Sequence, residues 1–255
     1  MNFFYYLCSM KTYNDIFIDF DDTLYDTRGN AIIALAETFD FFSLGRYFDD
    51  PNFFYDNYWK TNLDLWTLYN KGEIDRQYLI VERFRRPLSL GKGLENVTEE
   101  FCLEISDKFL DFCSNKPGTV KGALELVTFL KTQGCHLHIC SNGFHEIQYK
   151  KLRACGLYDY FDTVILSEDA GANKPSKKFF DYAFEKTGAK PETTLMIGDN
   201  YTADIEGAMD AGLDTILYNR WDASFVPPRK PTYVVNELEE IIMTLPLTHP
   251  IKGGE

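Results

Sequence analysis

Positive charge is scarce in this chain. Its 255 residues include 26 lysines and arginines against 39 aspartates and glutamates, so the formal net charge is −13 at pH 7. Because nucleic-acid polymers and anionic membrane surfaces repel such a protein, this balance argues against either as a partner. A small anionic substrate has to be captured locally, by a metal ion, a lysine or backbone N–H groups.

Membrane-length apolar runs, closely paired cysteines, repeats and low-complexity tracts are absent as well. The apolar cluster near the N-terminus is far too short to cross a bilayer and lacks the cleavage site of a signal peptide. We expect residues 1–10 and 246–255 to be flexible termini, with the true start at Met1 or Met10. None of the six cysteines forms a CxxC pair, and Cys140 ends an apolar run. This usage is typical of reduced structural thiols in a cytoplasmic protein.

An apolar segment, Ile16–Ile18, leads into two closely spaced carboxylates, Asp19 and Asp21. Side chains of a strand alternate between its two faces, so both carboxylates should leave the strand end on the same side. They repel each other unless a cation lies between them, and Mg²⁺ is the natural cation for oxygen ligands. The pair also suits chemistry in which Asp19 attacks an electrophile and Asp21 transfers protons. The alternative is an acidic turn after a buried strand.

A second polar segment, Ser141-Asn142-Gly143, follows the apolar run 137–140. A hydroxyl group and exposed backbone N–H groups at a strand end can hold the oxygens of a phosphoryl group. The same three residues would also make an ordinary strand-to-helix turn, and for this segment taken alone that turn is the preferred interpretation.

A lysine stands just before an expected helix. Lys174 is followed by Pro175, which suits the first position of a helix, and the apolar residues Phe179 and Phe180 continue the helical pattern. The lysine could reach an anionic centre from there, or it could be a solvated surface lysine.

A further acidic segment follows the apolar run 195–198. Asp199 ends this run, and Asn200 and Asp204 come shortly after it. The alternative to a functional role is helix capping, since Asp199, Asn200 or Thr202 could cap the helix that follows.

Strands and helices are expected to alternate along most of the chain. The expected strands lie near 15–20, 136–141, 163–167, 194–199 and 214–218, and the expected helices near 121–133, 145–155, 176–188 and 202–212. This alternation predicts an α/β fold, a doubly wound parallel sheet with right-handed crossovers. Ligands of such sheets bind beyond the carboxyl ends of the strands, where all the polar segments above are expected.

The connection between the first two strands is far longer than one crossover helix requires. We therefore expect a core formed by residues 11–28 and 113–245, and a helical cap formed by residues 29–112. Helices within the cap are expected at 31–41, 58–69, 77–84 and 99–112.

The expected cap is rich in aromatic residues, which most simply form the core of a small helical bundle. Trp66 or Tyr69 could instead stack on a base or a sugar. Three arginines, Arg83, Arg85 and Arg86, are expected to be exposed helix charges, with substrate binding as the alternative.

Taken in order, the polar segments resemble the four motifs of the haloacid dehalogenase (HAD) superfamily. The resemblance implies a Rossmann-like core with a helical cap inserted after the first motif. It also implies a Mg²⁺-dependent phosphomonoester hydrolase that forms an aspartyl-phosphate. The dehalogenases that name the superfamily lack the second aspartate of the first motif and need no metal, so Asp21 and Asp199 favour phosphoryl chemistry. The ATP-driven pumps of the superfamily need membrane spans, whereas phosphomutases share all four motifs and remain an alternative.

The resemblance assigns a role to each matching residue. The catalytic residues it implies are Asp19, Asp21, Ser141 and Lys174. It implies metal binding by Asp19, the carbonyl group of Asp21, and Asp199. The implied phosphate-binding groups are the N–H groups of Asn142 and Gly143, and the implied supporting residues are Asp204, Thr23 and Asn200. Of these, Asp204 is expected to orient Lys174 or metal-bound water.

The substrate class follows from a narrower resemblance, to the pyrimidine 5′-nucleotidase branch. The similar core segments are 141–144, 160–162, 173–175 and 179–183, and the more loosely similar cap segments are 65–66, 72–74 and 83–84. They imply a small phosphorylated substrate, a nucleoside monophosphate, with no nucleic-acid polymer and no membrane as partner. Alternatives are a sugar-phosphate or phosphoglycolate phosphatase, a phosphomutase, or a non-catalytic protein that binds a phosphate ligand.

Overall fold

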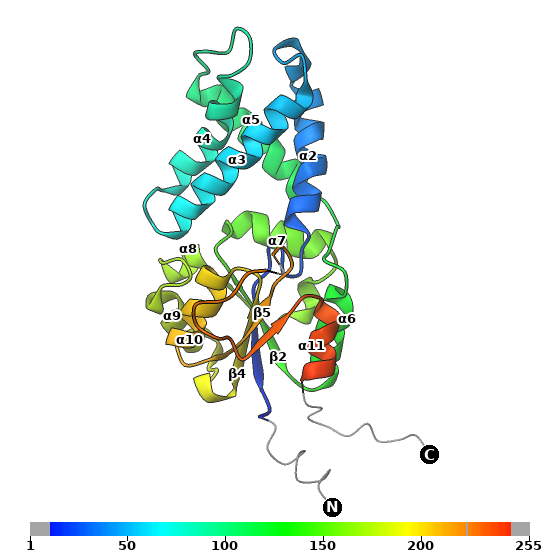
Figure 1. The fold of residues 1–255 in the computed structure, drawn as a ribbon, viewed down its shortest axis with the longest axis vertical. Helices are drawn as coiled ribbons and strands as arrows, with labels where there is room; N and C mark the ends of the chain where they lie inside the picture. Colours follow the sequence, from blue (N-terminus) through cyan, green and yellow to red (C-terminus); the bar gives the residue numbers. More distant parts are fainter. Residues whose placement is uncertain (1–10, 223, 246–255) are drawn as a thin grey trace, which may run out of the picture. The chain divides into compact units, whose positions relative to one another are not determined.

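Six parallel strands form the only sheet among the residues that this computed structural model describes, which are 11–222 and 224–245 (Figure 1). The strands are β1 (Asp15–Ile18), β2 (His136–Ser141), β3 (Thr163–Leu166), β4 (Thr194–Gly198), β5 (Asp214–Tyr218) and β6 (Tyr233–Val235). Their spatial order is β3-β2-β1-β4-β5-β6, and every neighbouring pair is parallel. The predicted doubly wound α/β fold is therefore confirmed, with β1 at its centre between β2 and β4.

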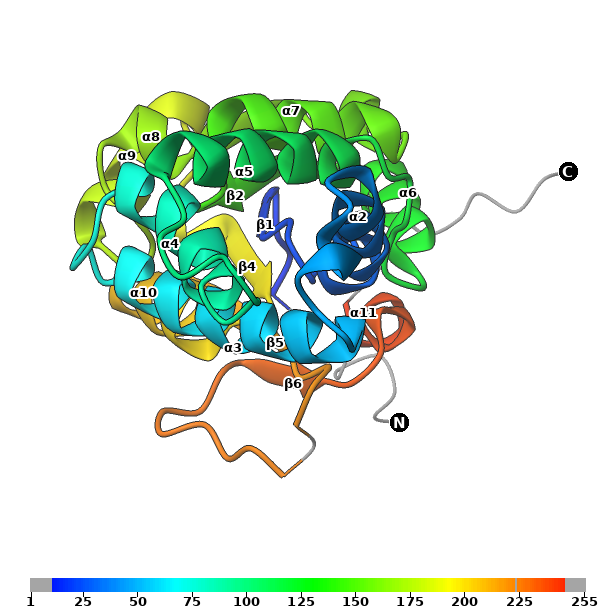
Figure 2. The ribbon, with the colours of Figure 1, turned by 90° about the horizontal axis from the view of Figure 1, so that it is seen from above.

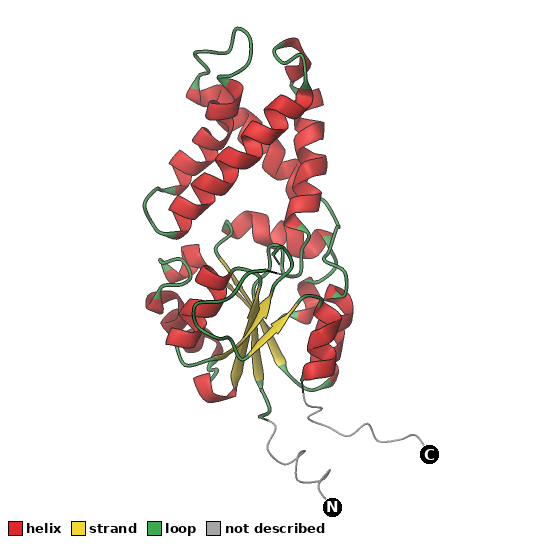
Figure 3. Ribbon diagram, viewed as in Figure 1, coloured by secondary structure: helices red, strands yellow, loops and turns green. Residues whose placement is uncertain are grey.

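Both faces of the sheet are covered by helices, which is why its strands are nearly continuous apolar runs. Phe17 points into a cluster formed with Phe179, Phe180 and Met196, on the face of α9 (Lys177–Thr187) and α10 (Gly207–Asp210). Helices α6 (Ala123–Thr132) and α11 (Leu238–Thr244) pack together on the opposite face (Figures 1 and 2). The helices and the yellow strands between them are plain in Figure 3.

The two helices expected after Lys174 differ from the structure. The helix expected from residue 176 begins at Lys177, because the side chain of Ser176 accepts a hydrogen bond from Lys178 N at 3.2 Å and caps it. Pro175 therefore lies before the helix and not at its first position. The helix expected at 202–212 is a π-helical turn, Tyr201–Glu206, followed by the short α10. Further elements are α7 (His145–Ala154), α8 (Ser167–Ala170) and the short 3₁₀ turns Leu44–Arg46, Tyr158–Tyr160 and Pro191–Thr193.

The chain divides into two compact units. The α/β unit comprises the residues up to Asp26, Thr119–His145, and the residues from Cys155 onward. The helical unit comprises Thr27–Gly118 and Glu146–Ala154, and its longer helices are α2 (Thr27–Phe41), α3 (Pro51–Asn70), α4 (Arg76–Leu88) and α5 (Glu99–Ser114). That the helical unit is a substrate-selecting cap remains a prediction.

The helical unit has an aromatic core of its own. Phe39, Phe54, Tyr58, Phe84 and Phe109 are all buried and lie in one cluster, as expected for a small bundle. Helix α3 begins at Pro51, earlier than the expected residue 58, because Asp50 accepts a hydrogen bond from Asn52 N at 3.0 Å and caps the helix. No helix in the described part of the chain combines the length and apolarity that a membrane span requires.

Arg83 corrects the expectation that the arginines of α4 are exposed. Its exposed fraction is 2%, and its Nη2 and Nε donate hydrogen bonds to the Ser106 hydroxyl at 2.6 and 3.2 Å. The guanidinium group lies 5.7 Å from the ring centroid of Phe84 and 5.4 Å from that of Phe109. Arg85 and Arg86 pair with Glu82 at the surface of the same helix.

Candidate active site

A sharp turn follows the central strand β1. Asp19 continues the strand, since its N–H donates a hydrogen bond to Ile197 O at 2.8 Å, and its side chain is buried. The next residues reverse direction: Leu24 N and Tyr25 N both donate to Phe20 O, at 3.0 and 2.9 Å. Asp22 has a φ of 61°, in the left-handed region that few residues other than glycine adopt. The turn thus fixes Asp19 at the carboxyl edge of the sheet and leaves Asp21 half-buried beside it.

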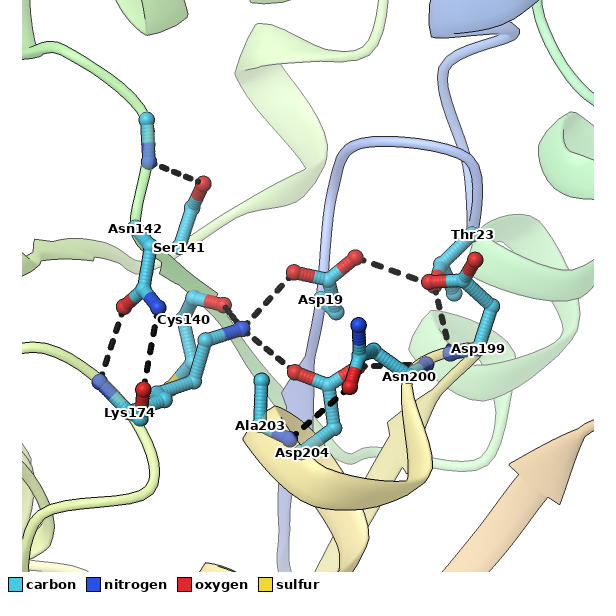
Figure 4. Close-up of polar contacts among 11 residues, drawn as sticks. Asp19, Thr23, Cys140, Ser141, Asn142, Lys174, Asp199, Asn200, Ala203 and Asp204 are labelled. Atoms are coloured by element: carbon cyan, nitrogen blue, oxygen red, sulfur yellow. Dashed lines mark hydrogen bonds and ion pairs between the residues drawn. The ribbon is translucent and has the colours of Figure 1, made fainter. Parts of the chain in front are cut away.

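Lys174 lies at the centre of the site (Figure 4). Its Nζ donates hydrogen bonds to Asp19 Oδ1 at 2.7 Å, Asp204 Oδ1 at 2.7 Å and the Cys140 carbonyl oxygen at 2.5 Å. With an exposed fraction of 1%, Lys174 is not a solvated surface lysine. Residues far apart in the sequence therefore meet at one ammonium group.

The segment Ser141-Asn142-Gly143 lies beside the lysine and holds its backbone. Lys174 N donates to Asn142 Oδ1 at 2.8 Å, and Asn142 Nδ2 donates to Lys174 O at 3.1 Å. Gly143 N, which the sequence suggested as a phosphate-binding group, donates to Ser141 Oγ at 3.0 Å (Figure 4). The buried amide side chain of Asn142 is thus engaged with the main chain of Lys174.

Thr23 links the first motif to the last. Its hydroxyl accepts a hydrogen bond from Asp199 N at 3.1 Å and lies 3.1 Å from Asp19 Oδ2, to which it donates. Asp199 Oδ1 lies farther from the same hydroxyl, at 3.4 Å. One small buried side chain therefore sets the spacing between Asp19 and Asp199.

Asp204 reaches the site because two glycines allow close approaches. A Cβ atom at Gly198 would lie 2.4 to 2.5 Å from side-chain atoms of Asp204, and one at Gly207 would lie 2.6 to 2.7 Å from Pro175. Asn200 N donates to Asp204 Oδ2 at 3.0 Å, so both carboxylate oxygens of Asp204 are engaged. Asn200 also caps the turn that carries Asp204, since its side chain accepts from Ala203 N at 2.9 Å.

Negative charge exceeds positive charge in this cluster. Carboxylate oxygens of Asp19, Asp199 and Asp204 lie within 4.8 Å of one another, yet within the described residues only Lys174 pairs with any of them. Burial, opposed by Lys174 but reinforced by Asp204 and Asp21, raises the pKa of Asp19 to about 7. Burial and the neighbouring Asp19 and Asp204 also hold the pKa of Asp199 well above its ordinary range. An oxygen-preferring divalent cation fits this set of donors, because it would supply the missing positive charge.

The pKa of Lys174 shifts in the opposite sense to that of an isolated buried lysine. Burial opposes its charged form, but the carboxylates of Asp19 and Asp204 outweigh burial and raise the pKa. Lys174 is therefore a fixed positive charge and not a proton donor near neutral pH.

The fold and the site together define a class: α/β proteins whose parallel sheet ends in a buried, lysine-bearing acidic centre. The chain belongs to the haloacid dehalogenase-like hydrolase family, whose profile matches residues 15–212. The expected superfamily is thus confirmed.

Individual relatives support the same assignment. The HAD hydrolase YfnB of Bacillus subtilis is 33% identical over 248 residues, which are 95% of this chain and 99% of YfnB. A crystal structure of YfnB bound to magnesium superposes with a TM-score of 0.80 and covers 92% of this chain and 99% of that one. The pyrimidine 5′-nucleotidase YjjG of Escherichia coli is 31% identical over 89% of this chain and 95% of its own length. A glyceraldehyde 3-phosphate phosphatase of Methanothermobacter thermautotrophicus is 28% identical over 80% of this chain and 84% of its own length.

Two neighbours of the site were missed by sequence reasoning. Arg220 pairs with Asp22, inside the first motif, and with Asp26, just after it, and the Trp221 ring stacks on the Arg220 guanidinium group. Both follow β5, whose end lies at the same edge of the sheet. That position was the available signal, since a strand end at this edge is where ligand-facing residues are expected.

Proposed function

We propose that this protein is a Mg²⁺-dependent phosphomonoester hydrolase that acts through an aspartyl-phosphate on Asp19, with pyrimidine nucleoside 5′-monophosphates as substrates. The observation that carries the proposal is the contact of buried Asp19 with Lys174, in a cluster where carboxylates outnumber cations. A site that only bound phosphate would gain nothing from this excess of negative charge. A nucleophile and a metal site require it.

In the proposed first step, a carboxylate oxygen of Asp19 attacks phosphorus and the bond from phosphorus to the ester oxygen breaks. Asp21 gives its proton to the leaving oxygen, so the nucleoside departs as an alcohol. Asp21 is half-buried and close to Asp19 in the turn, which suits a group that must exchange its proton with water.

In the proposed second step, water attacks the phosphorus of the aspartyl-phosphate. Asp21 takes a proton from that water, inorganic phosphate leaves, and the carboxylate of Asp19 is restored. The proton balance closes, because Asp21 donates one proton in the first step and regains one in the second.

Asp19, Asp199 and the carbonyl group of Asp21 would hold the Mg²⁺ ion. When bound, such an ion neutralises phosphoryl oxygens and favours the charged form of its carboxylate ligands. The latter effect matters here because the pKa of Asp19 is raised to about 7, whereas a nucleophile must be deprotonated.

The other residues of the motifs neutralise charge, bind the phosphoryl group or support neighbouring side chains in the proposal. Lys174 neutralises the anions that crowd around Asp19, and the Ser141 hydroxyl with the N–H groups of Asn142 and Gly143 binds phosphoryl oxygens. Gly143 N would then exchange its hydrogen bond to Ser141 Oγ for one to the substrate. The supporting residues, which keep Lys174, Asp19 and Asp199 in place, are Asp204, Thr23 and Asn200.

The proposed substrate rests on the relation to YjjG, a pyrimidine 5′-nucleotidase. The relation to a glyceraldehyde 3-phosphate phosphatase makes sugar phosphates the second candidate. Five cysteines of the described chain are free thiols, which supports the cytoplasm as the compartment.

The proposal is tested by phosphate release from a panel of monophosphates, with and without Mg²⁺. The panel contains pyrimidine and purine nucleotides, sugar phosphates and phosphoglycolate. We expect Mg²⁺-dependent turnover that favours UMP or dTMP, and a loss of at least about 10⁴-fold in kcat in the Asp19→Asn variant. Turnover confined to sugar phosphates would retain the mechanism and replace the substrate. An Asp19→Asn variant that keeps its activity would overturn the mechanism.

A further inference from the structure

The loop after β5 contacts the segment that follows the first motif. Arg220 Nη2 lies 2.7 Å from Asp26 Oδ1, and Arg220 Nη1 lies 3.6 Å from Asp22 Oδ1. Asp22 is the residue with a left-handed backbone directly after Asp21, and Asp26 is the last residue before the chain enters the helical unit. One guanidinium group thus pairs with two carboxylates of the segment that directly follows Asp21.

This arginine differs from an ordinary surface arginine. Its side chain is mostly buried, as are those of Asp22 and Asp26, so solvent weakens these pairs less than it weakens exposed ones. Its Nη1 is buried and has no hydrogen-bond acceptor within the described residues. The planar guanidinium group presents its donors on separate nitrogen atoms in a fixed geometry, whereas the ammonium group of a lysine presents rotatable donors on one nitrogen atom.

The next residue of the loop, Trp221, supports this arginine. The Arg220 guanidinium lies 4.3 Å from the centroid of the Trp221 ring, so the two side chains stack. The backbone of the loop is anchored, since Asn219 N donates to Val235 O at 2.8 Å. All of these residues belong to the α/β unit.

We propose that Arg220 is a positioning residue that fixes Asp21, and that the Trp221 ring keeps the Arg220 guanidinium group in place. Arg220 holds Asp22 and Asp26, which follow Asp21 in the chain. The inference rests on the proposed function, because it assigns these residues to the same site.

The same loop offers a matched control. Arg229 forms an ion pair with Asp210, but both side chains are more than half exposed and neither contacts the first motif. If any charge on this loop affected catalysis, Arg229→Gln and Arg220→Gln would behave alike.

The first experiment compares Arg220→Gln, Arg220→Lys and Arg229→Gln, with p-nitrophenyl phosphate and the best substrate of the panel. We expect kcat to fall about 10-fold in Arg220→Gln with KM nearly unchanged, because Arg220 orients a catalytic group without binding substrate. Arg220→Lys should recover only part of the loss, and Arg229→Gln should match the unmodified protein. Equal kcat values in all four proteins, or a change confined to KM, would overturn the role of Arg220.

The second experiment titrates the unmodified protein with Mg²⁺ alone, by calorimetry, and measures turnover of Trp221→Leu, which lacks the ring stacked on the Arg220 guanidinium group. We expect kcat of Trp221→Leu to fall less than that of Arg220→Gln, with KM nearly unchanged, because Arg220 keeps its ion pairs with Asp22 and Asp26. A kcat equal to that of the unmodified protein would overturn the role of Trp221.

The two proposals fail in different ways. Absence of both turnover and Mg²⁺ binding in the unmodified protein would reject the proposed function and this inference together. Normal Mg²⁺-dependent turnover in the unmodified protein, with all loop variants unaffected, would reject only the inference.

Discussion

Lys174 of the α/β unit and Arg83 of the helical unit are equally buried cations, with exposed fractions of 1% and 2%, but their surroundings differ. Lys174 contacts two carboxylates and a carbonyl oxygen, whereas Arg83 contacts one hydroxyl group and two aromatic rings.

The groups around each cation determine whether its pKa falls or rises on burial. Burial lowers the pKa of Arg83, and the nearby Tyr58 and Cys113 offset this only in part. The carboxylates around Lys174 reverse the effect of burial and raise its pKa. A buried cation is therefore not evidence of function by itself. The carboxylates gathered around it are what indicate a functional site.

The largest effect on stability and turnover is expected for a substitution that removes the cation of the acidic cluster. Lys174→Met leaves Asp19 and Asp204 buried without their cation, so we expect the free energy of unfolding to fall by about 3–5 kcal/mol, together with loss of turnover. Denaturant unfolding followed by circular dichroism measures the first, and phosphate release the second. Full stability in the variant would show that the carboxylates are protonated and do not depend on the lysine.

The second expected effect concerns pH. Because the folded pKa of Asp19 is raised from 3.8 to about 7, the folded protein binds an extra proton, and its stability falls as pH rises from about 4 to about 7. Asp19→Asn should therefore raise the metal-free melting temperature at about pH 8 and leave it unchanged at about pH 4. The exposed Asp64→Asn substitution on α3 is the control, and an equal response of both variants would contradict the assignment.

Adding Mg²⁺ gives a further test of the raised pKa of Asp19. A metal ion binds the deprotonated carboxylates, so it should raise the melting temperature of the unmodified protein more at about pH 8 than at about pH 5. Differential scanning fluorimetry with and without Mg²⁺ measures the difference, which should shrink in Asp19→Asn.

The smallest effect is expected for substitution of Arg83, the buried cation of the helical unit. Arg83→Met places an apolar chain of similar length between Phe84 and Phe109, so we expect a change of at most about 2 kcal/mol, mostly from the unpaired Ser106 hydroxyl. Turnover should remain within about twofold of normal. A large loss of kcat or a large rise in KM would give Arg83 a role in substrate binding, the alternative to a structural arginine.

Much of the α/β unit was predictable because its signals are local. Apolar runs of strand length ended in polar residues at each motif, and the parallel fold then required these ends to meet at one edge of the sheet. The proximity of Asp19, Lys174 and Asp199 follows from that rule alone, without any knowledge of side-chain contacts.

What escaped prediction depends on contacts between distant segments. Arg220 and Trp221 follow a strand without any motif, and only the contacts of Arg220 with Asp22 and Asp26 indicate a role for them. Arg83 looked like its exposed neighbours on α4, because helical spacing does not reveal which polar residue faces a partner hydroxyl. The start of α3 at Pro51, by contrast, could have been predicted from the sequence, since Asp50 and Pro51 are a local capping signal.

The two hydrogen bonds between Asn142 and Lys174 have a mechanical consequence. A side-chain amide has the same donor and acceptor as a peptide group, so Asn142 pairs with the backbone of Lys174 as a residue of an adjacent strand would. The loop after β2 and the loop before α9 are thereby joined as one rigid body beyond the end of the sheet. A displacement of the Ser141–Gly143 loop should therefore carry Lys174 with it, so the proposed phosphate-binding groups and the ammonium group would keep a constant separation.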